Sequence, residues 1–158
     1  MAANSTLGIN VYYAWQTTAG VKPSTGFTLL SDEITEIPEF DTAPEGLDAT
    51  PLSELVSVRR IPGLKDNGDD FSLTVNMSQT LITAWATIVS AAATNIPLGK
   101  YLELMIVIPD YTDAYFISGT PVALGFAGAS VNEVFQGALH ITPYQDHGWA
   151  TKGTITTA

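Results

Sequence analysis

Few residues of this 158-residue chain have the types and spacing that catalysis or metal binding requires. The two histidines, His140 and His147, are seven residues apart, and His140 lies on the polar side of an alternating segment, which favours a surface or interface role. The run D-N-G-D-D at residues 66–70 resembles the start of a calcium loop, but its twelfth position is Met77, where an EF-hand needs glutamate. A turn is the better interpretation of this run.

The motifs of the common enzyme classes do not occur in the sequence. It contains no G-x-S-x-G nucleophile elbow, no H-E-x-x-H and no glycine-rich phosphate loop. Carboxylates are numerous, but no pattern singles out an acid–base pair for glycoside hydrolysis. The lack of cysteine excludes disulfides, thiolate zinc sites and cysteine nucleophiles, and it fits folding in a reducing cytosol. We therefore expect a protein that is not an enzyme and has no cofactor and no metal.

The charge balance is strongly acidic, with 16 acidic against 6 basic residues and a net charge of −10. A surface of this sign repels phosphate backbones, so DNA is expected to pass along it without specific binding. Half of the acids lie between residues 32 and 54, where they form either a solubilising face or a dedicated electrostatic surface. Arg59 and Arg60 are the only basic pair in this region, and they form either a local ion pair or a clamp on a neighbour's carboxylates.

Residues 34–70 must position most of these charges, yet they show no sustained helical or strand period. Four prolines (Pro38, Pro44, Pro51 and Pro62) interrupt the segment. Structureless connections longer than about 12–15 residues are uncommon in compact domains. Ordering about 30 residues costs roughly 30–60 kcal/mol of backbone entropy. Because the segment is rich in spaced apolar residues, we expect it to gain its order by lying on another subunit.

Outside this segment the pattern predicts strands and one helix. Strands are predicted at residues 7–15, 27–30, 71–77, 101–108, 114–117, 122–126 and 131–141. A helix is predicted at residues 78–94, because Ser78 is a good N-cap and an apolar stripe centred on Trp85 follows it. Pro97 and Gly99 prevent the helix from continuing.

These elements predict a mainly β fold: a two-sheet antiparallel β-sandwich or barrel with one flanking α-helix (about 78–94) and a long extended loop (about 34–70). Residues 1–144 are expected to form a single domain that includes this loop, and residues 145–158 a C-terminal extension. The four lysines lie near strand ends or in loops, so the sheet edges are open to pairing with other copies. The apolar runs are shorter than a membrane span requires, and no secretory signal opens the chain, so we expect no membrane partner.

Three linked motifs give the long segment a family resemblance. They are T-E-I-P-E-F at residues 35–40, P-E-G-L-D-A-T at 44–50 followed by L-S at 52–53, and R-I-P-G-L-K-D at 60–66. In this order they resemble the phage tail tube (major tail) proteins of long non-contractile-tailed phages, in which a similar run precedes a strand and then a helix. The resemblance is strong over residues 28–78 and follows the order of elements elsewhere.

The resemblance implies a tail-tube fold that assembles as stacked hexameric rings into a hollow tube. Sheets of adjacent subunits would join into a barrel that lines the lumen, and the long loop would reach neighbouring subunits and rings. The tube would hold the tape-measure protein and conduct the genome, with the tail terminator and distal tail proteins as further partners. The implied location is the virion tail, with host cytoplasm before assembly. Six copies at −10 give −60 per ring, an acidic conduit that does not retain DNA.

The residues expected at the inter-subunit and inter-ring interface belong to this loop. They are Ile37, Pro38, Glu39, Phe40, Leu47, Leu52, Arg59, Arg60, Ile61, Pro62, Leu64, Lys65 and Asp66. The alternative function is an immunoglobulin-like adhesion or capsid-decoration domain. That function needs an exposed aromatic patch for carbohydrate, for which Tyr12, Tyr111 and Tyr115 are the candidates.

Overall fold

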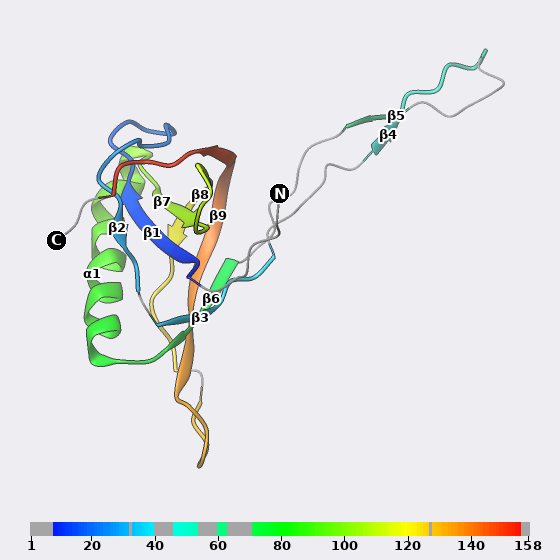
Figure 1. Ribbon diagram of the computed structural model, residues 1–158. Coiled ribbons are helices and arrows are strands. Elements are labelled where there is room, and N and C mark those ends of the chain that lie inside the picture. Colours follow the sequence, from blue (N-terminus) through cyan, green and yellow to red (C-terminus); the bar gives the residue numbers. More distant parts are fainter. Residues whose placement is uncertain are drawn as a thin grey trace.

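The computed structural model describes residues 8–31, 33–39, 46–53, 60–62, 71–126 and 128–155. One antiparallel sheet of seven strands, in the order β2-β1-β7-β8-β9-β6-β3, forms the body (Figure 1). Its strands are β1 (Asn10–Trp15), β2 (Thr28–Leu29), β3 (Ile34–Glu36), β6 (Phe71–Asn76), β7 (Leu102–Val107), β8 (Asp113–Pro121) and β9 (Gln136–Thr151). A separate two-stranded sheet consists of β4 (Gly46–Asp48) and β5 (Arg60–Pro62).

The seven-stranded sheet curls into a half-barrel around its longest strand. The first residues of β9 pair with β6, and its part from Ile141 to Thr151 pairs with β8. The β8–β9 register shifts twice, between Phe116 and Ile117 and between Ser118 and Gly119. Such irregularities bend strands and increase their twist, which curls the sheet. The mainly β, antiparallel prediction is confirmed.

A single curled sheet replaces the two packed sheets that the sequence pattern predicts. The cause is β9, which belongs to both halves of the sheet and so keeps them continuous. The expected boundary at residue 144 falls inside this strand, so residues 145–151 belong to the sheet. Beyond the strand, Ile155 forms a parallel bridge with Phe27, which ties the last described residues to the body.

Helix α1 (Gln79–Asn95) covers one face of the sheet and confirms the predicted helix (Figure 1). The Ser78 hydroxyl oxygen accepts a hydrogen bond from the Leu81 N–H at 3.2 Å, as an N-cap does. A 3₁₀ turn, η1 (Ile96–Leu98), follows the helix, and Gly99 closes it at a φ of 76°. The buried side of α1 is its apolar stripe, which packs into the main core. These residues are Leu81, Trp85, Ile88 and Ala92.

The opposite face of the sheet has its own small core. Phe27, Met105 and Phe116 are completely buried there. The loop after β1 and the residues after β9 hold this core closed, because the Phe27 N–H donates to the Thr154 carbonyl at 3.2 Å. Gly153 lies so close to Phe27 that a Cβ would come within 2.5 Å of its ring. Loops therefore cover the face that a second sheet would cover in a sandwich.

Two predicted strand segments are loops in the structure. Residues 122–126 form no strand, although the Val122 N–H still donates to the His140 carbonyl of β9 at 3.0 Å. β9 begins only at Gln136, so residues 131–135 also lie outside the strands. Pro121 ends β8, and the next carbonyl, that of Val122, accepts a 2.8 Å hydrogen bond from the Trp85 indole N–H. Residues 123–126 thus line the space beside helix α1 instead of pairing with a neighbouring strand.

Candidate assembly surface

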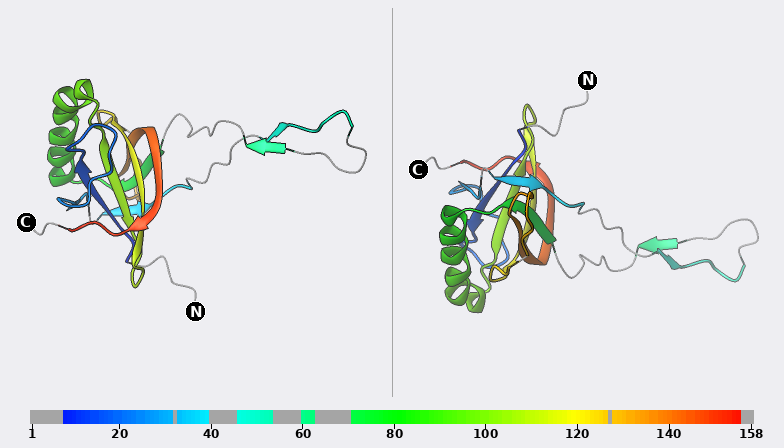
Figure 2. Two further views of the ribbon diagram at one scale, coloured as in Figure 1. Left: turned by 90° about the horizontal axis from the view of Figure 1, so that it is seen from above. Right: turned by 90° about the horizontal axis from the view of Figure 1, so that it is seen from below.

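The arm, residues 34–70, leaves the sheet through β3 and returns to it at β6. Its middle forms a small hairpin, which we call the arm hairpin (β4, β5 and residues 49–53). β4 and β5 pair antiparallel, with Leu47 opposite Ile61 and Asp48 opposite Arg60. Figures 1 and 2 show this hairpin away from the seven-stranded sheet, on the side opposite α1. An isolated two-stranded hairpin is marginally stable in water, so it needs further contacts.

The structure places the predicted interface residues in two groups. At the base of the arm, Ile37 packs against the main core, Pro38 is half-buried and Glu39 is exposed. In the arm hairpin, Leu47 is 48% exposed and Leu52 is fully exposed, while Arg60, Ile61 and Pro62 form β5. Phe40, Arg59, Leu64, Lys65 and Asp66 lie outside the described residues. The hairpin therefore presents apolar side chains that no neighbouring described element covers.

The sheet has short edge strands. β2 has two residues and β3 has three. β2 pairs with β1 at Tyr12 and Tyr13, and the Leu30 N–H adds one bond to the Val11 carbonyl. Short edges limit pairing with unrelated chains. They also leave part of the longer inner strands open to a strand from another copy.

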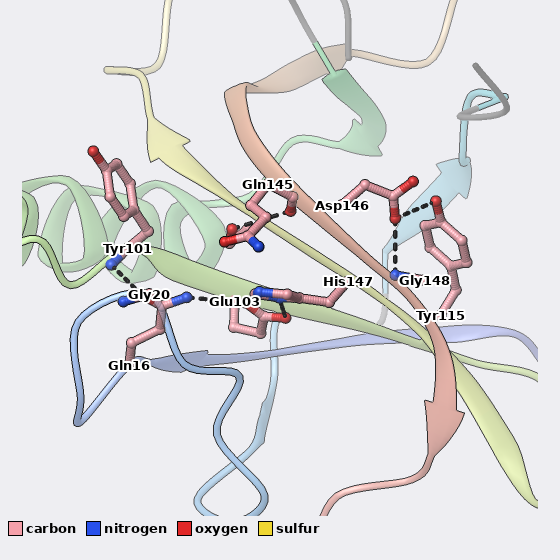
Figure 3. A network of polar contacts seen from close by, with 10 residues as sticks. Gln16, Gly20, Tyr101, Glu103, Tyr115, Gln145, Asp146, His147 and Gly148 are labelled. Carbon is pink, nitrogen blue, oxygen red and sulfur yellow. Dashed lines mark hydrogen bonds and ion pairs between the residues drawn. The ribbon is translucent and has the colours of Figure 1, made fainter. Parts of the chain in front are cut away.

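A buried polar network joins three segments of the body (Figure 3). Glu103, the second residue of β7, is completely buried, and its Oε1 lies 2.7 Å from His147 Nδ1 on β9. The other carboxylate oxygen accepts a 3.4 Å hydrogen bond from the Gln16 side-chain amide. The Gln16 Oε1 in turn accepts from the Gly20 and Tyr101 N–H groups, each at 3.1 Å. The network ties the loop after β1 to β7 and β9.

Burial raises the pKa of Glu103, while the hydrogen bond and the charge of His147 act in the opposite direction. The Glu103 side chain is 0% exposed and the His147 side chain 12%, so the pair is closed to a substrate and fits a structural role. This pair was not predicted from the sequence. Its signal is that Glu103 is the one charged residue in the apolar run 101–108.

The predicted metal, histidine and carbohydrate sites can be compared with the structure. In the described part of the chain, no three His, Asp or Glu side chains lie close enough to hold a metal ion. The D-N-G-D-D run at 66–70 lies outside the described residues, and His140 is exposed on β9. Tyr12 aligns with Met105 and Phe116 across the sheet, whereas Tyr115 precedes Phe116 and so points to the opposite face. The aromatic patch expected for carbohydrate is therefore not assembled.

Helix α1 also has the composition of a membrane span, contrary to the expectation from the apolar run lengths. Gln79–Leu98 reaches a mean hydropathy of 1.4 over 18 residues, and 22% of that window is buried. One such helix is weak evidence for a membrane, because helices of soluble cores pass the same test. Here its apolar stripe packs on the sheet, and its exposed side carries Thr, Ser, Gln and Ala together with Ile82.

The fold of this chain is similar to that of a known protein, although its sequence matches none that was compared. No family model matches the chain, and no curated protein matches its sequence. Among solved structures, it is similar to a chain in the cryo-EM structure of the anti-feeding prophage (AFP) baseplate, 6-fold symmetrised, with a TM-score of 0.56 and 12% sequence identity. The match covers 97% of this chain and 98% of that chain. The protein thus shares its fold, over nearly its whole length, with a component of a prophage-derived baseplate.

Proposed function

We propose that this protein is a structural protomer of a phage or phage-like tail, which assembles as stacked hexameric rings into a hollow tube. The observation that carries the proposal is the end-to-end fold match to a chain of a baseplate solved with six-fold symmetry. The three linked arm motifs point in the same direction, toward tube proteins of long non-contractile tails. The role proposed is structural, without catalysis, metal, cofactor or membrane partner.

The arm supplies the physical reason for assembly. Leu47 and Leu52 are exposed in the single copy, and each fully buried aliphatic side chain contributes about 1.5–3 kcal/mol. Sister copies can provide that burial. A contact that joins one surface of a protomer to a different surface of the next closes into a ring or grows as a helix. Rings of this kind enclose a lumen when they stack, as the proposed tube requires.

The charge of the chain fits a conduit. Six copies carry −60 per ring, and an acidic wall repels the phosphates of a passing genome. The further partners of the proposed tube are the tape-measure protein inside it and the tail terminator and distal tail proteins at its ends. The proposed location is the virion tail, after folding in the host cytoplasm.

Negative-stain microscopy of the concentrated protein tests the proposal. We expect six-fold rings and stacks of rings, with sedimentation showing species of six or more copies. Lower protein concentration should return the sample to smaller species, since assembly follows mass action. A protein that stays monomeric at every concentration, and also in the presence of its virion partners, would contradict the proposal.

A further inference from the structure

An open apolar groove of about 670 Å³ runs between helix α1 and the loop segments that follow β8 and precede β9. Trp85 and Leu124 line it, together with Ile82 and Ala86 from the helix and Phe126 and Phe135 from the loops. Phe126 is 78% exposed and Phe135 41%. The volume falls within the range of about 300–1,000 Å³ found for ligand pockets, so it suits a few side chains more than a whole domain.

The groove is held open in the single copy. The Trp85 indole N–H donates to the Val122 carbonyl at 2.8 Å, which fixes the start of the loop against α1. The Met77 N–H donates to the Phe135 carbonyl at 3.0 Å, which fixes the other end. The rings of Phe126 and Phe135 lie 5.6 Å apart and support each other. The site is therefore already formed in the single copy.

The groove is also free of charge. None of the residues that line it is acidic or basic, and α1 contains no charged residue along its whole length. The arm, by contrast, lies in the part of the sequence that holds half of the acids of a chain with net charge −10. A like-charged surface would repel the arm, whereas this uncharged groove does not.

We infer that the groove is the receptor for the arm hairpin of a second copy, with Leu47 and Leu52 entering it. The inference rests on the proposed function and names the surface that the arm contacts. The exposed aliphatic side chains of the hairpin of one copy would enter the open apolar groove of another copy. Burial of both sets removes two apolar surfaces from water in one contact.

The fold separates the arm from the groove of its own copy. β3 runs antiparallel to β6, with Ile34 opposite Val75 and Glu36 opposite Thr74. The arm therefore leaves β3 at the Phe71 end of β6. Met77, which borders the groove, follows the other end of this strand. A strand of six residues is roughly 20 Å long, so the base of the arm and the groove lie at opposite ends of β6. Figures 1 and 2 show the arm hairpin and α1 on opposite sides.

Cross-linking between single-cysteine variants tests the contact, because the chain has no native cysteine. Leu52→Cys mixed with Ala86→Cys should give at least about tenfold more disulfide-linked dimer than Leu52→Cys mixed with Val21→Cys. Val21 is a matched control, since it is 54% exposed and lies outside the groove, in the loop that covers the other face. Equal yields in the two mixtures would overturn the inference.

A charge substitution gives a second test. Ala86→Asp places a carboxylate in the groove, and we expect the concentration needed for ring assembly to rise about tenfold, the effect of losing one buried aliphatic contact. Thr87→Asp adds the same charge at the next position of α1, which is exposed and lies outside the groove. This variant should change the concentration needed for ring assembly by less than about twofold. Equal melting temperatures of the two variants show that both remain folded.

The outcomes separate this inference from the proposed function. If the unmodified protein forms rings but the Leu52–Ala86 cross-link does not form in them, the inference is wrong and the proposed function stands. If no ring forms under any condition, the proposed function itself fails. Flotation with phosphatidylcholine vesicles that Ala86→Asp abolishes would also overturn the inference, because it would identify a lipid surface as the occupant.

Discussion

Glu103 shows how a single residue can join segments that are far apart in the sequence. A buried carboxylate is costly unless it is hydrogen-bonded, and here His147 and Gln16 supply the partners. Lys22 adds a favourable charge and places its ammonium 4.2 Å from the Phe116 ring centroid on the same side of the sheet. These contacts lower the pKa of Glu103, but desolvation outweighs them, so its pKa stays above its usual value.

This shift predicts a pH dependence of stability. The folded state holds the Glu103 proton more tightly than the unfolded state does. The contribution of Glu103 to the free energy of unfolding is therefore greatest at acid pH. That contribution decreases as pH rises from about 4.5, the usual value, through the raised pKa. Each unit of pKa difference corresponds to about 1.4 kcal/mol.

Glu103→Gln removes the titration and keeps the shape of the side chain. We expect the difference in free energy of unfolding between the two proteins to shift in favour of the variant as pH increases. Urea unfolding of both proteins between about pH 4 and 7 measures this difference, because the other carboxylates are common to both. A constant difference across the range would show that Glu103 does not titrate differently in the two states.

At the scale of elements, α1 depends on its first turn. Ser78 caps the helix through its hydroxyl oxygen, and no acidic residue in the first turn adds to the cap. Ser78→Ala should lower the free energy of unfolding by about 1 kcal/mol. Ser90→Ala, an exposed substitution inside the same helix, should leave it unchanged or raise it slightly, because alanine favours helices. Similar losses in both variants would mean that the cap contributes nothing specific.

The elements also show what the sequence could and could not predict. α1 and β6 were predictable because their periods of 3.6 and 2 are regular and each buries one face. Residues 122–126 have the same period of 2, but beyond the bond from the Val122 N–H to the His140 carbonyl they form no described strand, and the Trp85 indole ties the Val122 carbonyl to α1. The length of β9 was missed because its last part, with Gly148 at a φ of 69°, lacks a regular apolar face.

The candidate surface was predictable only in part. The prolines and spaced apolar residues of the arm mark it as an unusual segment, and Leu47 and Leu52 are exposed in the structure. The groove could not be inferred, because Trp85, Leu124 and Phe135 are brought together only by the fold. The Glu103–His147 pair depends in the same way on strands far apart in the sequence.

At the scale of the whole molecule, the arm and the body are separable. Every strand of the seven-stranded sheet lies outside residues 41–58, whereas β4 lies inside. Deletion of residues 41–58 should therefore change the melting temperature of the monomer by less than about 4 °C, the shift that roughly 1 kcal/mol causes. The same deletion should abolish ring stacking in negative-stain images.

Two results would contradict this separation. A deletion variant that still forms tubes would show that the arm is not the stacking element. A variant that unfolds would show that the arm belongs to the core of its own copy. Circular dichroism melting distinguishes the second result from a simple loss of assembly.

The arm and the groove lie at opposite ends of β6, and this placement gives any stack a direction. One terminal ring would present only projecting hairpins and the other only receptive clefts. Elongation at the two termini would then have different rate constants. A protein that blocks growth by imitating the hairpin would act at one terminus alone, and its counterpart at the other terminus would have to imitate the cleft.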